Sequence, residues 1–191
     1  MVLRAIPDDR YLSLMSLRIF RAGLKHALVD GKWPAFEEVF HGFDPRRARA
    51  MSEEDVETLM GDKRIIRHYG KLRAVPANAA AMIEVSAARG GFGAYLAEWP
   101  GTDITGLWAD LATRFSQMGG NSGAYFLRMA GKDTFILTPY VVAALIGTGA
   151  IERKPGGKKD RARVQAAFND WAAETGRPLA QLSMILARAQ E

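Results

Sequence analysis

The spacing of the apolar residues constrains the fold of this chain more than any other feature. Within residues 12–29, Leu17, Phe20, Leu24 and Leu28 follow one another at intervals of three or four positions, which places them on one face of a helix. Similar spacing recurs along the chain, and no stretch alternates convincingly between apolar and polar residues with the period of a strand. The pattern therefore predicts an all-α fold without a sheet.

Turn and capping residues divide this pattern into segments. Asp44 before Pro45 is typical of a helix N-cap followed by a first helical position, and Ser52 before three acidic residues indicates another helix start. Pro76 lies inside the helical pattern of residues 71–88, so that helix must start late or kink. The other expected helices are residues 34–40, 107–118, 124–130, 139–146, 160–175 and 178–189.

Composition limits the class of protein. The chain has 191 residues, of which 48% are apolar and 25% charged, as in globular proteins that bury a core. A length of this kind allows one domain or two small ones. The two helices expected after the basic loop 151–159 are too short to fold alone, so we treat residues 1–191 as a single domain.

The absence of cysteine excludes disulfides and thiolate metal sites. We see no signal peptide and no apolar run of membrane-spanning length, and we expect a cytoplasmic protein that needs no metal or other cofactor. The net charge of +5 and the pI near 9.6 permit binding to nucleic acid without requiring it.

A glycine-rich turn is the strongest local signal for function. Gly119, Gly120, Asn121, Ser122 and Gly123 lie between two expected helices. Such a turn exposes backbone N–H groups at the start of a helix, where the helix dipole favours an anion. The turn is therefore either a plain connection between core helices or a cradle for phosphate.

Several blocks of residues, in order and with matching spacing, resemble the DNA-3-methyladenine glycosylase I family. Residues 119–135 are in addition similar to the hairpin and second helix of the helix-hairpin-helix DNA glycosylase superfamily, with the whole hairpin element at about residues 107–131. The resemblance extends over roughly residues 10–150. The blocks of the first half are Arg-Ala-Gly-Leu-Lys-His at 21–26, Trp-Pro-Ala-Phe at 33–36, Phe-Asp-Pro at 43–45, Ile-Ile-Arg-His-Tyr-Gly-Lys-Leu at 65–72 and Asn-Ala at 78–79.

The resemblance implies a two-lobed helical bundle with a cleft between the lobes. It implies an enzyme that hydrolyses the N-glycosidic bond of alkylated purines in DNA, chiefly 3-methyladenine, to start base excision repair. The partner would be double-stranded DNA with the damaged nucleotide flipped into the cleft. We expect the protein to act as a monomer, away from membranes.

Roles carried over from the family concern DNA first. By resemblance, residues 119–123 would lay their amides on DNA phosphates. Gly23 and Leu24 match a loop that enters the gap left by the flipped base, although Leu24 could equally be a core residue. Arg67, His68 and Lys71 match a basic loop that could touch the backbone, or could simply be solvated.

The base pocket departs from the family pattern. The position of the acidic residue that recognises the base is occupied by Arg18, and the position of the stacking tryptophan by His26. A cationic side chain there would repel a cationic base. The family's zinc site needs cysteines and histidines near the chain ends; here the only histidines are His26, His41 and His68.

No catalytic residue can be assigned with certainty from the resemblance. Many helix-hairpin-helix glycosylases carry an aspartate after the second hairpin helix; here Thr138 occupies that place, with Tyr140 nearby. Glu38 and Tyr140 are the candidate replacements, and Asp30 and Glu37 are further acids, all of which could be plain surface residues. The sequence thus leaves three functions open: a glycosylase, a DNA-binding relative without a working base pocket, and an all-α interaction scaffold.

Overall fold

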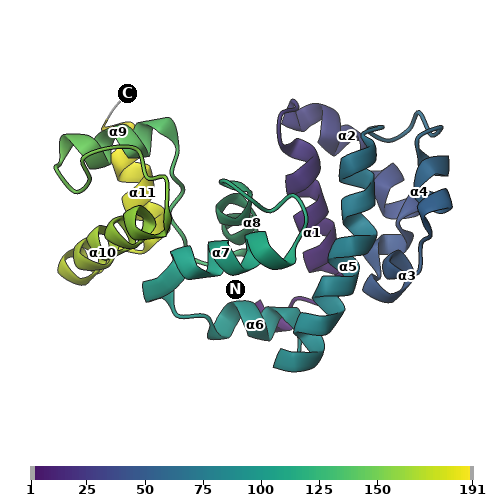
Figure 1. Cartoon of the computed structure of the whole chain (residues 1–191), viewed down its shortest axis with the longest axis horizontal. Helices are drawn as coiled ribbons and strands as arrows, with labels where there is room; N and C mark the ends of the chain where they lie inside the picture. The colour runs from purple at the N-terminus through teal and green to yellow at the C-terminus, as the bar shows by residue number, and fades with distance from the viewer. Residues whose placement is uncertain (1–2, 190–191) are drawn as a thin grey trace.

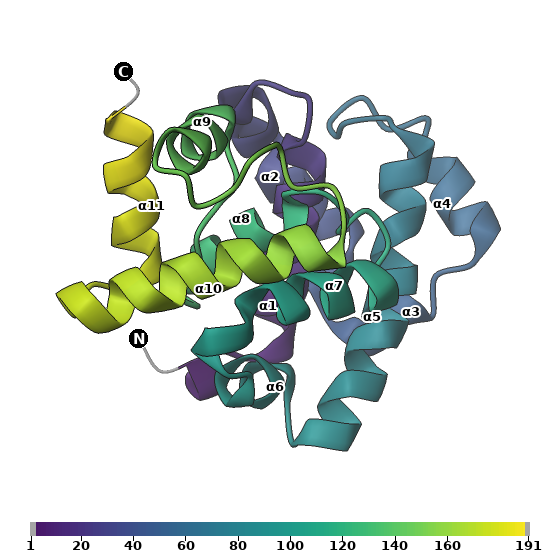
Figure 2. The ribbon, with the colours of Figure 1, turned by 60° about the vertical axis from the view of Figure 1, so that its left-hand side comes forward.

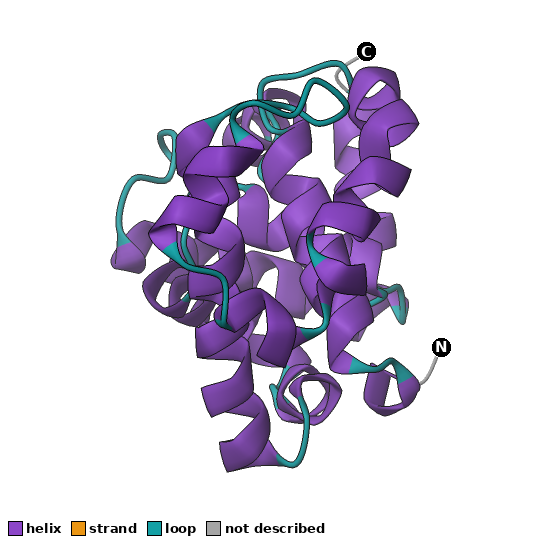
Figure 3. Cartoon of the chain, turned by 90° about the vertical axis from the view of Figure 1, so that its right-hand side faces the viewer, coloured by secondary structure: helices purple, strands orange, loops and turns teal. Residues whose placement is uncertain are grey.

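The computed structural model describes residues 3–189, which form helices and loops without any strand in that range (Figure 3). The all-α prediction is confirmed. The α-helices are α1 (Asp8–Arg21), α2 (His26–Val39), α3 (Pro45–Arg49), α4 (Glu53–Leu59), α5 (Tyr69–Arg89), α6 (Phe92–Glu98), α7 (Ile104–Arg114), α8 (Ser122–Ala130), α9 (Pro139–Gly147), α10 (Lys158–Thr175) and α11 (Leu179–Arg188). Short 3₁₀ turns are η1 (Leu3–Ala5), η2 (His41–Phe43) and η3 (Gly101–Asp103).

The helices form two groups joined by a middle layer. Figure 1 shows α1 to α5 on one side and α9 to α11 on the other, with α6 to α8 between them. In the turned view of Figure 2, α10 crosses in front of α7 while α9 and α11 lie together, and contacts join both pairs. Among the helices of residues 3–189, none is long and apolar enough to cross a membrane.

Capping residues set helix starts as the sequence predicts. The Asp44 side chain accepts hydrogen bonds from the N–H groups of Arg46 and Arg47, with Pro45 in the first helical position of α3. Ser52 accepts from the N–H of Asp55, whose carboxylate accepts in return from the N–H of Ser52, completing a capping box at α4.

The single helix predicted for residues 12–29 is instead two helices separated by a turn. Gly23 has φ +78°, a conformation that ends α1 and that side chains rarely adopt. The ammonium of Lys71 donates to the carbonyls of Phe20 (3.3 Å) and Ala22 (2.6 Å), which α1 leaves without helical partners. The prediction fails because the apolar spacing continues through the turn, although Leu24 in the turn and Leu28 in α2 are both exposed.

Two further boundaries differ from prediction. The helix containing Pro76 begins at Tyr69, well before the proline, so a late start is excluded. Helix α7 ends at Arg114 rather than at residue 118. The buried side chain of Asn78 explains this end: its amide donates to the Ser116 carbonyl (3.1 Å) and its oxygen accepts from the Ser116 N–H (2.7 Å). These bonds give the backbone N–H and carbonyl of Ser116 partners outside a helix, in the segment that leads into the glycine turn.

The C-terminal helices are fastened to the middle layer. The Phe135 ring stacks on Phe168 of α10 with centroids 4.0 Å apart, and it also meets the edge of Trp108 from α7. Asp133, in the loop after α8, accepts from the N–H groups of Leu179 and Ala180 at the start of α11. The Phe135 ring and the Asp133 carboxylate thus each join a C-terminal helix to the segment that follows α8.

Candidate nucleic-acid interface

The glycine turn connects the extended end of α7 to α8. Gly119 and Gly120 are exposed, and Gly120 has φ +59° with open space where a Cβ would lie. Gly123 is buried, close to the Cα of Trp108 and the side chain of Leu111. The backbone of Gly119 and Gly120 can therefore approach another molecule closely, while Gly123 serves packing.

The turn is tied to the segment that precedes α9. The Asn121 amide donates to the Leu137 carbonyl at 2.9 Å. One residue later, the Thr138 hydroxyl accepts from the N–H of Val141 and caps α9. The structure thus brings the hairpin and the Thr138 position together, and it gives Thr138 a capping role that a side-chain oxygen suits.

The loop between α1 and α2 exposes one apolar side chain, that of Leu24, which is 37% exposed. Leu28, in the first turn of α2, is 50% exposed, so neither leucine is a core residue. The Lys71 ammonium holds the loop through the Ala22 carbonyl. An ordered loop carrying an exposed leucine is the shape required to fill a gap in a base stack.

The three basic residues that match the family's basic loop have different surroundings. Arg67 and His68 are exposed, and the His68 ring accepts from the N–H of Lys71 at the start of α5. Lys71 itself is only 9% exposed and donates to α1 carbonyls. Burial, and then the nearby Arg18, lower the pKa of Lys71. Arg67 and His68 therefore remain candidates for the phosphate backbone, whereas Lys71 organises the Leu24 loop.

Arg18 lies in the last turn of α1 against the first turns of α8. Its guanidinium carbon is 4.5 Å from the centre of the Tyr125 ring, and its Nε is buried without a hydrogen-bond partner. Desolvation lowers the pKa of Arg18, the neighbouring Tyr125 raises it and Arg21 lowers it further. Apolar spacing does not predict this contact, because Tyr125 lies in an apolar helix where it is expected to be a core residue.

The other predicted site residues have surroundings that differ from those of Arg18. His26 is exposed in the first turn of α2, and no hydrogen bond or ring stacking joins it to Arg18 within the described residues. Glu38 is also on α2 and accepts two hydrogen bonds from the Arg64 guanidinium, at 3.0 and 2.9 Å. Tyr140 is 53% exposed in the first turn of α9. Glu38 and Tyr140 therefore lie on separate helices.

The two additional acids are paired with arginines. Both oxygens of Asp30 accept from Arg21, at 2.8 and 2.7 Å. Glu37 accepts from both terminal nitrogens of Arg10 and from the Ser13 hydroxyl at 2.6 Å. These pairings favour a structural role for both carboxylates. Within residues 3–189, no group of three or more His, Cys, Asp or Glu side chains is arranged to hold a metal ion.

A groove of about 590 Å³ adjoins the hairpin. Gly120 and Asn121 of the glycine turn line it, together with apolar residues of α9 and the basic residues Lys154 and Arg161. The groove therefore combines apolar and basic lining residues, and the glycine turn forms part of its wall.

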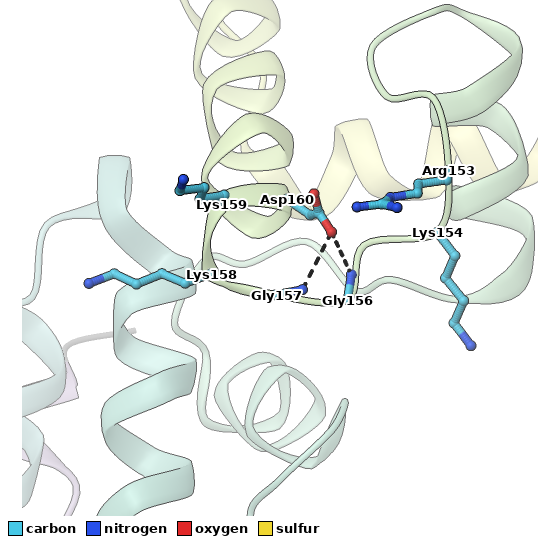
Figure 4. Close-up of a pocket in the computed structure, with 7 residues that line it drawn as sticks. All are labelled: Arg153, Lys154, Gly156, Gly157, Lys158, Lys159 and Asp160. Carbon is cyan, nitrogen blue, oxygen red and sulfur yellow. Dashed lines mark hydrogen bonds between the residues drawn. The ribbon is translucent and has the colours of Figure 1, made fainter.

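The basic loop before α10 forms an open depression of about 600 Å³ (Figure 4). Lys154 and Lys158 point in opposite directions, and the Asp160 carboxylate accepts from the N–H groups of Gly156 (3.0 Å) and Gly157 (3.4 Å). These hydrogen bonds, and then the nearby Arg153 and Arg163, lower the pKa of Asp160, so its carboxylate stays ionised to a lower pH than that of an ordinary aspartate. The loop can attract a polyanion, but it does not focus its cations on one point.

The architecture is that of the helical DNA glycosylases. The chain belongs to the methyladenine glycosylase family, whose profile matches residues 4–117. It is 45% identical to DNA-3-methyladenine glycosylase 1 of Escherichia coli K12 over 78 residues, which are 41% of this chain and 42% of that protein. The match thus spans less than half the length of this relative.

Solved structures extend the comparison. A point mutant of 3-methyladenine DNA glycosylase I from Staphylococcus aureus aligns with a TM-score of 0.60 at 25% identity, over 66% of this chain and 78% of that one. The Methanocaldococcus jannaschii 8-oxoguanine glycosylase/lyase, solved with DNA, aligns over 98% of this chain and 84% of its own, with a TM-score of 0.54 and 12% identity. The latter likeness shows the fold alone.

The family match ends within the hairpin element, just before the glycine turn. The sequence resemblance extends over roughly residues 10–150, whereas the family profile covers residues 4–117. The Arg18 position, the Leu24 loop and the basic loop around Arg67 therefore lie within the matched region. The glycine turn, Thr138 and the C-terminal helices lie beyond it.

Proposed function

We propose that this protein is a DNA glycosylase of base excision repair that releases alkylated purines of the 3-methyladenine type from double-stranded DNA. The observation that carries the proposal is the ordered loop between α1 and α2, with Leu24 exposed and Lys71 holding its backbone. It accompanies a hairpin whose exposed glycines suit phosphate contact. Family membership over residues 4–117 supports the same reading.

The reaction requires modest help from the protein when the base is cationic. The oxygen of water bonds to the sugar carbon and one proton of that water passes to solvent. The N-glycosidic bond breaks, and its electrons leave with the base, which neutralises the positive charge of the base. The protein must chiefly extrude and hold the nucleotide, and damage makes extrusion easier. In this proposal the Gly119–Gly120 backbone anchors the strand, Leu24 fills the gap, and Arg67 and His68 contact the backbone.

Release of free base from methylated duplex DNA tests the enzymatic proposal. We expect 3-methyladenine to appear in the soluble fraction, in proportion to protein and time, under conditions where unmodified duplex yields none. If the protein binds duplex DNA in a salt-dependent way but releases no base, the enzymatic proposal is contradicted. Failure to bind intact, abasic and alkylated duplexes alike would contradict any role on DNA.

A second candidate function is DNA binding without base release. It is favoured by the residues that replace the expected acids: Arg18 stacks on Tyr125, and Thr138 caps α9. No carboxylate occurs in the sequence between Asp133 and Glu152. The base-release assay separates this candidate from the glycosylase.

Replacing Leu24 with alanine tests the gap-filling role. Because Leu24 is 37% exposed, we expect the free energy of unfolding to fall by less than about 1 kcal/mol. Affinity for a duplex with an abasic site is expected to fall roughly fivefold, since a wedge that supports the distorted duplex is lost. Leu28→Ala, at a site 50% exposed, is the matched control. Equal losses for the two variants would assign Leu24 no special role.

A further inference from the structure

We infer that Arg18 extends the substrate range to a neutral purine with a carbonyl group at carbon 6, of which hypoxanthine is the simplest. The inference rests on the proposed function, because Arg18 occupies, by resemblance to the family, the position of the residue that recognises the base. The observations that carry it are the position, contacts and unused hydrogen-bonding capacity of the Arg18 guanidinium.

The Arg18 guanidinium stacks on an aromatic ring but has no hydrogen-bond acceptor in the part of the chain that the structure describes. It lies 4.5 Å above the Tyr125 ring, and within residues 3–189 its side chain makes no ion pair and no hydrogen bond. Other arginines on α1, Arg10 and Arg21, are paired with Glu37 and Asp30. Arg18 is therefore a planar fork of donors that stacks on an aromatic ring and has no hydrogen-bond partner within the described residues.

The charge around this fork selects the ligand. The nearby Lys71 ammonium is directed to the carbonyls of Phe20 and Ala22, and the nearby Arg21 is neutralised by Asp30. No carboxylate is paired with Arg18 in the described part of the chain, so a cationic base would meet uncompensated positive charge. A neutral base that presents hydrogen-bond acceptors would meet no such repulsion.

The donor geometry points to a particular purine edge. Arginine pairs in bidentate fashion with the O6 and N7 acceptors of a 6-oxopurine. Adenine-type bases present an amino donor at carbon 6, which would face the guanidinium donors. Guanine shares the O6 and N7 acceptors but is held by its pairing with cytosine, whereas hypoxanthine opposite thymine is mismatched and easier to extrude.

The same contact assists bond cleavage. In hydrolysis of a neutral deoxynucleoside, the oxygen of water bonds to the sugar carbon, and the base leaves with the electron pair of the broken bond and takes up a proton. Negative charge therefore develops on the departing purine. Guanidinium donors on O6 and N7 stabilise that charge, which never forms when the base departs from a cationic nucleotide.

The test compares two substrates with wild-type protein and Arg18 variants. Wild-type protein is expected to release hypoxanthine from a hypoxanthine·thymine duplex. Arg18→Met should lower this release about tenfold or more, and raise release of 3-methyladenine several-fold as the repulsion disappears. Arg18→Lys keeps the charge without the planar fork and should restore little hypoxanthine release. Tyr125→Phe keeps an aromatic ring against Arg18 and should keep hypoxanthine release. Tyr125→Leu removes that ring and should lower hypoxanthine release.

Binding measurements separate failure of this inference from failure of the proposed function. Wild-type protein should bind the hypoxanthine duplex more tightly than a matched adenine·thymine duplex, and Arg18→Met should lose that preference. If no base is released from any duplex, the proposed function fails while this preference still decides the role of Arg18. Equal binding of both duplexes by the wild type, or equal loss of both activities in Arg18→Met with an unchanged melting temperature, would overturn the inference.

Discussion

Replacing Gly120 with valine is expected to weaken binding to duplex DNA roughly tenfold at every sequence, through loss of one or two backbone–phosphate hydrogen bonds. Gly120 has φ +59°, which a β-branched residue adopts only with strain, and its Cβ position opens to solvent. The variant should still fold, because nothing lies within 4 Å of the added Cβ. Fluorescence anisotropy with labelled duplexes of several sequences measures the loss.

A matched control separates strain from DNA contact. Gly149 has φ +74° and open space at its Cβ, but it lies in the loop after α9. Gly149→Val should therefore carry a similar folding cost with little change in affinity. The salt dependence should be unchanged in Gly120→Val, since amide contacts release no counterions beyond those displaced by basic side chains. If a folded Gly120→Val variant keeps full affinity, the hairpin does not bind phosphate.

Replacing Phe135 with alanine is expected to lower the free energy of unfolding by about 3–5 kcal/mol. The ring is fully buried, stacks on Phe168 at 4.0 Å and meets the edge of Trp108. It thus joins α10 to the layer that carries the hairpin, and its removal leaves a cavity between them. A loss of this size is a large fraction of the stability of a typical domain.

Urea unfolding followed by circular dichroism measures this change. Tyr140→Ala is the control, because Tyr140 is 53% exposed and its truncation should change stability by about 0.5 kcal/mol or less. The Phe135 variant is also expected to bind DNA less well, since Phe135 precedes the Leu137 carbonyl that holds Asn121. A Phe135→Ala variant as stable as the Tyr140 control would show that the C-terminal helices are not anchored through this ring.

Apolar spacing and capping residues predicted which parts of the chain are helical, because both act over a few neighbouring residues. Asp44 and Ser52 mark helix starts in the sequence and do so in the structure. The same local rules failed at the end of α1 and at the end of α7. There, Lys71 and Asn78, both on α5, bind the backbone of segments remote in sequence.

The features of the candidate site also fall into those that the sequence shows and those that only the folded structure shows. The glycine turn and the blocks of residues that resemble the family were readable in the sequence, since motif identity and spacing are properties of the chain itself. The surroundings of each charged group were not. Arg18 stacks on Tyr125, and Glu38 accepts from Arg64. Lys71 donates to two carbonyls at the end of α1. Each of these contacts forms only when segments remote in sequence pack together.

By itself, the sequence determined an all-α chain with a glycine-rich turn and an arginine at the position where the resemblance implies an acid. Only the tertiary structure decided that Leu24 is exposed, that Lys71 supports the loop around it, and that Arg18 keeps its donors free. The physical reason is that helix formation depends on neighbours along the chain. Exposure, pairing and pKa depend instead on side chains that folding brings together across it.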